Sequence, residues 1–265
     1  MPKTTRITYR VTDGTETLGQ SAAELATASI ERAIAARGVA RVAISGGNTP
    51  RRYFEMLADP ALPFRDRIDW ARLFLFWVDE RCVPPDNVES NYRMTREALL
   101  SKVPLPETQI FRMEGELDPA EAASRYESMI RNLFRLEGAE VPCFDLIALG
   151  MGDDGHTASL FPNTEALHEW MRLVVANSVP QKNTWRITLT APVINHARSV
   201  FFLIEGQGKA HILHRVMQGP YLPEITPAQL IRPDSGELLL LLDRPAAMEL
   251  PAPDAEGVGI LEVTR

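Results

Sequence analysis

The sequence predicts an α/β fold, namely a doubly wound, mostly parallel sheet with helices on both faces. Short apolar runs typical of buried strands alternate along the chain with stretches whose apolar residues recur at helical spacing. Glycine-rich or charged segments follow directly after several of these runs. An open sheet of this kind binds ligands in the crevice outside the carboxyl ends of its strands. The residues after the predicted strands are therefore the first candidates for a functional site.

The whole chain, residues 1–265, is predicted to form one domain, because it has no linker, low-complexity tract or internal repeat. A hydrophobic content of 45% is ordinary for a globular protein. The net charge of −7 argues against binding to nucleic acid or to an anionic membrane surface. No apolar run approaches the roughly 20 residues that a membrane span requires.

The cysteine content and the N-terminal residues predict a cytoplasmic protein. Cys82 and Cys143 are the only two cysteines, and residues 1–6 lack the apolar core of a secretory signal. Without CxxC or His-rich spacing no zinc site is expected, and without a GxGxxG fingerprint after a strand no dinucleotide is expected. The sequence leaves the oligomeric state open and is compatible with a monomer.

Helix start signals and apolar spacing place the elements of the first half. Asp13 with Glu16 resembles a capping box, Pro50 suits a first helical turn, and Ser90 and Asp118 are suitable N-caps. The first predicted helix follows Asp13 and ends near Gly38. After it come a strand at 42–44, a helix from Pro50 through Leu57, a strand at 73–78, a helix from Ser90 through Leu99, and a helix from Asp118 through Phe134.

In the second half, a strand before Gly150 is followed by predicted strands at 186–190 and 199–205, with a helical turn at 192–196 between them. Residues 209–217 read as a helix and residues 237–242 as a strand. The tail after Pro251 is too weakly patterned to assign.

The most informative stretch runs from Phe144 to Pro162, where a buried strand leads into a loop of glycines, carboxylates, hydroxyls and one histidine. Glycines let the backbone approach a ligand, and an imidazole can act as an acid or a base near neutral pH. His156 is therefore the candidate base. The other histidines lack such a setting and read as surface or packing residues, namely His168, His196, His211 and His214.

Two further segments follow predicted strands. Ser45 to Thr49 opens a helix, so that its N–H groups and hydroxyls can bind an oxyanion, although a simple tight turn is the alternative. In the triplet of Asp79, Glu80 and Arg81, one side chain is expected to point into the site while another forms an ion pair that shapes the loop. A purely structural triplet remains the alternative.

Taken together, these segments resemble the 6-phosphogluconolactonase family, within the glucosamine-6-phosphate isomerase/6-phosphogluconolactonase superfamily. Residues 150–162 are similar to its GMGxDGHTASLFP loop. Other segments fit the family in the same order, and they are Ile44 to Pro50, Trp77 to Arg81 with Ser90-Asn91, and Arg186 to Thr190 with Gly206, Gly208 and Lys209. The resemblance covers most of residues 40 to 210.

The resemblance implies the hydrolysis of 6-phospho-D-glucono-1,5-lactone to 6-phosphogluconate in the oxidative pentose phosphate pathway, without a metal or cofactor. The partner is then a small-molecule sugar phosphate lactone. The catalytic candidates are His156, Asp79, Arg81 and Asp154. The substrate-binding candidates are Ser45, Gly46, Gly47, Asn48, Thr49, Gly152, Arg186 and Lys209. The sequence does not decide whether Asp153 or Asp154 orients the imidazole or whether both hold loop N–H groups.

Arg186 and Lys209 are the implied phosphate clamps, since a guanidinium holds phosphate bidentately and an ammonium acts as a point charge. Arg186 begins its predicted strand, so it reaches the site only if that strand runs antiparallel to the others. A nucleophilic role for Cys82 is disfavoured, because no histidine is placed near it by the sequence.

Two alternative functions remain. One is a glucosamine-6-phosphate isomerase/deaminase, whose family shares the fold and a DGH loop but follows that loop with an Asn-Glu-Pro segment, where this chain has Ser159 to Pro162. The acid that assists ring opening is then missing. The other is a non-catalytic sugar-phosphate sensor, which would need an effector module such as a basic helix-turn-helix that the sequence does not suggest.

Overall fold

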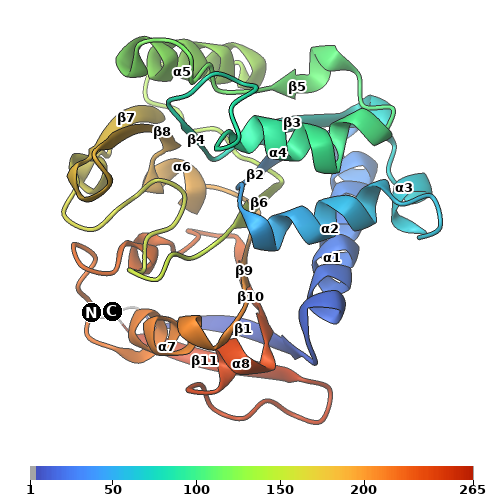
Figure 1. Ribbon diagram of the computed structural model, residues 1–265, viewed down its shortest axis with the longest axis vertical. Helices are drawn as coiled ribbons and strands as arrows, with labels where there is room; N and C mark the ends of the chain where they lie inside the picture. The colour runs from blue at the N-terminus through green and yellow to red at the C-terminus, as the bar shows by residue number, and fades with distance from the viewer. Residues whose placement is uncertain (1–3, 265) are drawn as a thin grey trace.

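The computed structural model describes residues 4–264 and contains two sheets (Figure 1). The main sheet has eight strands in the order β11-β1-β10-β9-β6-β2-β3-β5. All neighbouring strands in it run parallel except β11, which is antiparallel to β1. In that order, its strands are Val258–Thr264, Thr4–Thr12, Glu237–Asp243, Ser199–Ile204, Leu146–Leu149, Ala40–Ile44, Leu73–Trp77 and Ile110–Phe111.

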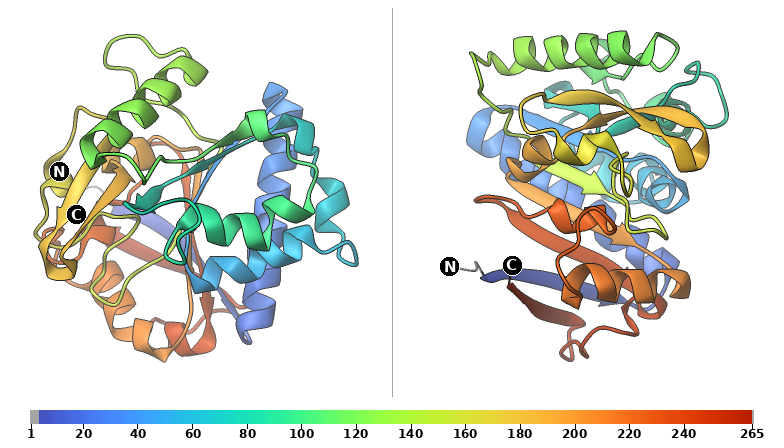
Figure 2. Two further views of the ribbon diagram at one scale, coloured as in Figure 1. Left: turned by 45° about the horizontal axis from the view of Figure 1, so that its top comes forward. Right: turned by 90° about the vertical axis from the view of Figure 1, so that its left-hand side faces the viewer.

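Side chains of the central strands alternate between two apolar cores, one on each face of the main sheet. Along β9, Phe201 and Leu203 pack into the core formed with α1, α2 and α4, whereas Phe202 and Ile204 pack into the core formed with α5, α6 and α7. The left view of Figure 2 shows α1 and α2 on one side of the sheet and α7 on the other. The predicted doubly wound α/β fold is therefore confirmed. These helices are Thr15–Arg37 (α1), Asn48–Ala58 (α2), Asn91–Ala98 (α4), Pro119–Phe134 (α5), Ala191–Asn195 (α6) and Ala210–Gln218 (α7), with the short α3 at Phe64–Arg67 and α8 at Arg244–Ala247.

A second, antiparallel sheet lies on the α5 side and was not predicted as a separate sheet. Its order is β4-β8-β7, with β4 at Asp79–Arg81, β8 at Thr184–Leu189 and β7 at Val174–Val179. The charged triplet after β3 is thus itself a short strand. β8 belongs to this sheet and not to the main one, it is antiparallel to both of its neighbours, and Arg186 stands opposite Arg81 in the ladder.

The predicted elements are found with small changes at their ends, but the capping box at the first helix is wrong. Gly14 is the N-cap of α1, and its N–H donates to Thr17 Oγ1 at 3.1 Å. Asp13 instead pairs with Arg244, and Glu16 pairs with Arg52. Both carboxylates are therefore used between elements and not at the helix end.

The crevice that the fold offers to a ligand lies where β2 and β6 meet at the centre of the main sheet. The chain continues from β2 to β3 on one side and from β6 to β9 on the other, which makes this a topological switch point. The Ser45 N–H donates to the Ala148 carbonyl at 3.0 Å, so the loops that leave the two strands start side by side. Within residues 4–264, no helix is both long enough and apolar enough to cross a membrane.

Candidate active site

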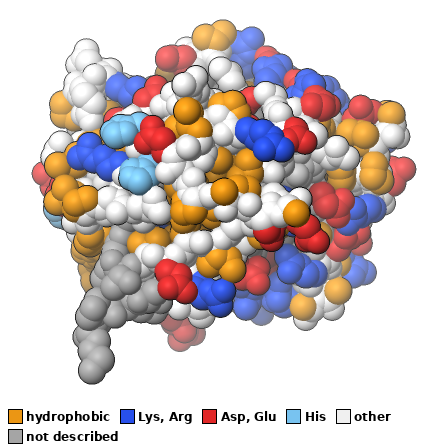
Figure 3. Space-filling model, turned by 90° about the horizontal axis from the view of Figure 1, so that it is seen from below, with side chains coloured by type: hydrophobic (Ala, Val, Ile, Leu, Met, Phe, Trp, Pro, Cys, Tyr) orange, Lys and Arg blue, Asp and Glu red, His pale blue; other side chains and the backbone are white. Residues whose placement is uncertain are grey.

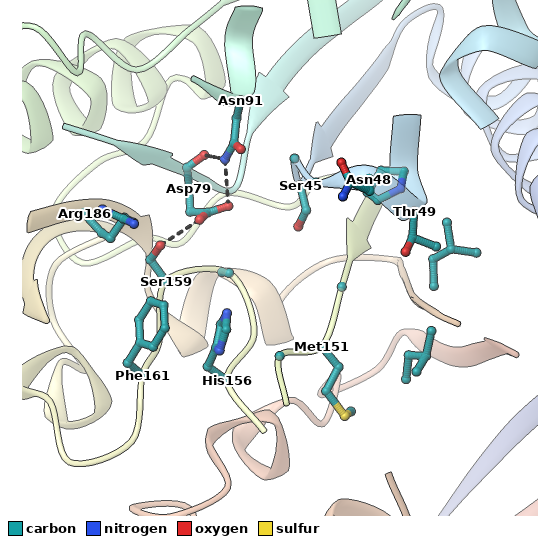
Figure 4. Close-up of a pocket in the computed structure, with 18 of the residues that line it drawn as sticks. Ser45, Asn48, Thr49, Asp79, Asn91, Met151, His156, Ser159, Phe161 and Arg186 are labelled. Atoms are coloured by element: carbon teal, nitrogen blue, oxygen red, sulfur yellow. Dashed lines mark hydrogen bonds between the residues drawn. The ribbon is translucent and has the colours of Figure 1, made fainter. Parts of the chain in front are cut away.

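A pocket of about 400 Å³ opens at this switch point, and every predicted site residue except Asp154 lines it. The segments after β2, β6 and β9 each supply residues, and β4 and β8 of the second sheet close one side. Figure 4 shows these side chains converging from different parts of the chain. The predicted lining residues are Ser45, Gly46, Gly47, Asn48, Thr49, Asp79, Arg81, Gly152, His156, Arg186 and Lys209.

The glycine loop after β2 brings backbone and helix end to the pocket. Gly47 adopts φ 116°, a conformation that favours glycine, and it is the N-cap of α2 without any side-chain cap. The N–H groups of the first turn are thus left for a ligand, and the helix dipole favours an anion there. Gly46 is required for packing, because a Cβ at this position would lie 1.9 Å from Asn91 Oδ1.

His156 is oriented by its own loop. Its Nδ1 lies 2.5 Å from Asp154 Oδ1, and the same carboxylate oxygen accepts the His156 N–H at 3.1 Å. Gly152 makes room for the ring, since a Cβ there would lie 2.0 Å from Nδ1. Asp154 therefore stands behind the imidazole and not in the pocket lining. No partner of Nε2 is found among the described residues, and Nε2 is the nitrogen left for a substrate.

The pKa of the Asp154 carboxyl reflects this arrangement. Partial burial opposes ionisation, but the hydrogen bonds and the charge of His156 outweigh burial and lower the pKa to about 2. In the neutral imidazole, an ionised Asp154 favours the tautomer that carries its proton on Nδ1, which leaves the lone pair on Nε2.

Phe161 forms a second support for the imidazole. The two rings stack with 4.0 Å between centroids and 23° between planes, and Lys182 Nζ lies over the Phe161 ring at 5.6 Å from its centroid. Lys182 belongs to the turn between β7 and β8 and also lines the pocket. Figure 4 shows the imidazole flanked by Phe161 and Met151.

The charged triplet of β4 divides into two roles. Asp79, only 6% exposed, accepts hydrogen bonds from the Ser159 hydroxyl at 2.7 Å and from Asn91 Nδ2 at 3.4 Å (Figure 4). Glu80, 2% exposed, accepts N–H bonds from Arg81, Asn91 and Tyr92 and a hydroxyl bond from Ser90. The loop-shaping contact expected to be an ion pair is therefore a set of hydrogen bonds. Burial raises the pKa of Glu80, although these bonds oppose the rise.

Cations gather in the pocket although the protein is acidic overall. Burial, and next the nearby Arg81 guanidinium, lower the pKa of Arg186. In the part of the chain that the structure describes, neither arginine forms an ion pair with a carboxylate, whereas Lys209 Nζ pairs with Asp153 Oδ1 at 2.5 Å. On the molecular face in Figure 3, by contrast, basic and acidic side chains are interspersed. Two guanidiniums that stand opposite each other in the ladder, without a carboxylate partner among the described residues, indicate a site for an anion.

Sequence reasoning did not assign several lining residues to the site, and four of them contact the proposed site side chains or carry polar groups. Asn91, Ser159 and Phe161 stand inside the family-like segments but were not assigned to the site, whereas Lys182, in the turn between β7 and β8, carried no sequence signal. None of the other histidines lines the pocket. Residues 4–264 contain no group of three or more His, Cys, Asp or Glu side chains placed to hold a metal ion.

Comparisons with known proteins agree with this geometry. A sequence profile of the family described as glucosamine-6-phosphate isomerases/6-phosphogluconolactonase matches residues 13–240. A 6-phosphogluconolactonase of Synechocystis sp. is 45% identical over 226 residues, which cover 84% of this chain and 90% of the relative. The probable 6-phosphogluconolactonase 2 of Oryza sativa subsp. japonica is 34% identical and covers 92% of this chain and 90% of its own length.

Solved structures show the same fold. The 6-phosphogluconolactonase of Trypanosoma brucei superposes with a TM-score of 0.81 at 28% identity, covering 92% of this chain and 98% of that chain. A monomeric glucosamine-6-phosphate deaminase superposes with a TM-score of 0.75 at 19% identity, covering 91% of this chain and 99% of that chain. At that identity the second likeness shows the fold alone.

Proposed function

The chain belongs to the glucosamine-6-phosphate isomerase/6-phosphogluconolactonase family, and we propose that it hydrolyses 6-phospho-D-glucono-1,5-lactone to 6-phosphogluconate with His156 as the general base. The observation that carries this proposal is the loop of residues 150–162, which holds the imidazole in the pocket with Asp154 on Nδ1. The sequence similarity to 6-phosphogluconolactonases supports the activity, and the pocket geometry supports the assignment of the base. The reaction belongs to the oxidative pentose phosphate pathway.

His156 starts the reaction. Because Asp154 holds the proton on Nδ1, Nε2 can take a proton from a water molecule as its oxygen attacks the lactone carbonyl. The carbonyl becomes a tetrahedral oxyanion. When it collapses, the bond to the ring oxygen breaks, and the imidazolium returns its proton to that oxygen. The products are the free acid and the ring-opened hydroxyl, and the base is regenerated.

The developing negative charge on the carbonyl oxygen needs donors that are in place beforehand. Arg81 and the backbone N–H groups of the loops after β2 and β6 line the pocket and supply them. Asp79, held by Ser159 and Asn91, presents a carboxylate that can accept a sugar hydroxyl. These contacts place the carbonyl next to the imidazole.

The phosphate group of the substrate binds at the cationic end of the pocket. Arg186, Lys209 and the first turn of α2 provide a guanidinium, an ammonium and uncapped N–H groups. Binding energy from this group, which does not react, orients the lactone against His156. The mechanism requires neither a metal nor an organic cofactor, because the lactone is an activated ester and its leaving group stays tethered.

The nearest rival is the isomerase/deaminase reaction of the same family. Those enzymes follow their DGH loop with an acid that assists ring opening, whereas here Leu160 is fully buried and Phe161 stacks on the base. Neither side chain can donate a proton.

Both Cys82 and Cys143 are free thiols, which favours the reducing cytoplasm as the compartment.

The test is to assay the purified chain on both substrates side by side, after exhaustive chelation and without added nicotinamide. We expect lactone hydrolysis and no release of ammonia from glucosamine 6-phosphate. The His156→Ala variant should lose about 10²- to 10⁴-fold in kcat while it still binds 6-phosphogluconate. Ammonia release without lactone hydrolysis would overturn the proposal. Binding of the sugar phosphate without any turnover would identify a sensor.

A further inference from the structure

Asp153 and Lys209 form an ion pair across the rim of the pocket. Asp153 belongs to the loop after β6, and Lys209 ends the short turn Gln207–Lys209 after β9. Lys209 Nζ lies 2.5 Å from Asp153 Oδ1. The lysine side chain is 24% exposed and the aspartate side chain is 87% exposed, so the pair joins a largely shielded ammonium to a largely exposed carboxylate.

The loop that carries His156 is held by Asp154 and not by the ion pair of Asp153 and Lys209. Among the described residues, Lys209 is the one partner of the Asp153 carboxylate, whereas the adjacent Asp154 bonds both the ring and the N–H of His156. An ion pair with so exposed a carboxylate contributes little to folding stability. Its effect must therefore be sought in the ligand that Lys209 is placed to bind.

We propose that Asp153 is a counter-ion that competes with the substrate phosphate for Lys209 and thereby limits the affinity for phosphorylated ligands. This inference rests on the proposed function. A phosphate bound to Lys209 carries up to two negative charges and comes close to the Asp153 carboxylate. Because like charges repel, the phosphate has to share or displace this partner. Arg81 and Arg186, which lack a carboxylate partner among residues 4–264, do not impose this competition.

The competition matters because the phosphate is common to the substrate and the product. An interaction that is equal in the ground state and the transition state lowers KM without raising kcat, and it also holds the product. By competing for Lys209, Asp153 reduces this shared affinity for the substrate and the product alike. Asp153 thus sets the affinity for phosphorylated ligands through Lys209 and does not touch the reacting atoms.

The test is calorimetric titration of the full chain with 6-phosphogluconate and with inorganic phosphate, for the wild type and for Asp153→Asn. We expect the variant to bind both probes about 2- to 5-fold more tightly at low ionic strength, which is the range for an exposed charge pair. The gain should shrink as salt screens the charges. KM should fall by the same factor while kcat stays unchanged, and gluconate, which lacks the phosphate, should show no gain.

Two controls separate competition from a general charge effect. Asp69→Asn removes one exposed carboxylate, paired with Arg72, far from the pocket and should change nothing. In a Lys209→Met background, Asp153→Asn should lose most of its effect, because the partner for which phosphate competes is gone.

Weaker or unchanged binding of phosphorylated probes by Asp153→Asn would overturn the inference, since a positioning role for Asp153 predicts weaker binding. An undiminished gain in the Lys209→Met background would overturn it too, as would a wild type that binds neither probe. Failure of the wild type to hydrolyse the lactone while it binds both probes would overturn only the proposed function.

Discussion

The ring of Phe161 stacks on the imidazole of His156, with 4.0 Å between centroids and 23° between planes. Together with the Asp154 carboxylate on Nδ1, this contact fixes both the tilt of the ring and the nitrogen that faces the pocket. The same phenylalanine occupies the position after Leu160, where an isomerase/deaminase would need an acid. One residue therefore supports the proposed base and stands where the alternative chemistry would need an acid.

Phe161→Leu should lower kcat about 3- to 10-fold and leave KM nearly unchanged, because an aromatic pair contributes about 0.5–1.5 kcal/mol beyond its buried area. The remaining bond to Asp154 keeps the imidazole in place most of the time. Steady-state kinetics with the phosphorylated lactone measures both constants. Phe161→Tyr, which keeps the ring, should retain most of the activity, and an equal loss in both variants would contradict a stacking role.

Gly152→Ala should abolish most of the activity while the protein stays folded. The added methyl group would lie 2.0 Å from His156 Nδ1 and 2.8 Å from Asp154 Oδ1, so the imidazole has to leave its position. We expect kcat to fall at least about 100-fold, comparable to the loss of a general base. Gly14→Ala, where a Cβ meets nothing within 4 Å, is the matched control and should retain full turnover.

Glu80→Gln should destabilise the protein by about 2–4 kcal/mol, measured by urea unfolding at neutral pH. An NH₂ group would replace one carboxylate oxygen, for example Oε2, which now accepts both the Tyr92 N–H and the Ser90 hydroxyl, so buried donors would face each other. Because the same bonds hold the segment that carries Asp79, kcat should fall as well. Glu89→Gln, an exposed change in the same loop, should leave the unfolding free energy within about 0.5 kcal/mol.

The raised pKa of Glu80 also sets the pH dependence of its contribution. The folded state binds the Glu80 proton more readily than the unfolded state does, so stability falls as pH rises through the window between the unfolded and folded pKa values. Glu80→Gln lacks this titration. The stability difference between wild type and variant should therefore be larger near pH 4.5 than near pH 8, and the opposite trend would contradict the assigned direction.

The central strands and the site were predictable because their signals are local. The apolar run from Leu73 to Val78 predicts one strand, and Pro50 predicts the start of one helix. The site could be predicted as well, because the carboxyl ends of parallel strands meet at one edge of the sheet. The strand at Arg186 was found, but its membership of a second sheet depends on pairing with β4 and β7, which no local pattern encodes.

The contacts missed in the sequence are those made over long separations. Asp154 and Asp153 are adjacent and chemically alike, yet one bonds His156 and the other reaches Lys209, 56 residues away. The capping box failed for the same reason, since Asp13 and Glu16 bind arginines of other elements. β1 and β11 pair with each other at one edge of the main sheet. Neither has the long apolar run that predicts a buried strand.

Cys82→Ser should leave kcat unchanged, and the wild-type enzyme should resist alkylation of this thiol at pH 8. Burial raises the pKa of Cys82 to about 11, while the nearby Arg186 opposes that rise. At pH 8 only about one thiol in a thousand is ionised, and the thiolate is the reactive form. Mass spectrometry after a brief treatment with iodoacetamide measures the modification, and rapid alkylation with loss of turnover would revive a nucleophilic role.

Arg186→Ala should weaken the binding of 6-phosphogluconate by about 1.5–3 kcal/mol, the cost of a lost charge-assisted hydrogen bond to a phosphate. Thr184 Oγ1 and the Trp185 carbonyl hold Nη1 of this guanidinium, which leaves its other donors for the ligand. Calorimetry measures the loss. Arg172→Ala, which removes an exposed arginine paired with Glu169 outside the pocket, is the control and should bind normally.

Arg186→Ala also distinguishes a specific contact with the phosphate from a general effect of Arg186 on the shape of the pocket. Burial and the Arg81 charge lower the pKa of Arg186, so the free enzyme keeps two like charges together that a bound dianion would relieve. Hydrolysis of unphosphorylated glucono-lactone, which offers no dianion, should therefore be nearly unaffected by Arg186→Ala. Arg186→Lys should recover only part of the affinity, because an ammonium cannot bind phosphate bidentately. An equal loss with both lactones would mean that Arg186 shapes the pocket and does not read the phosphate.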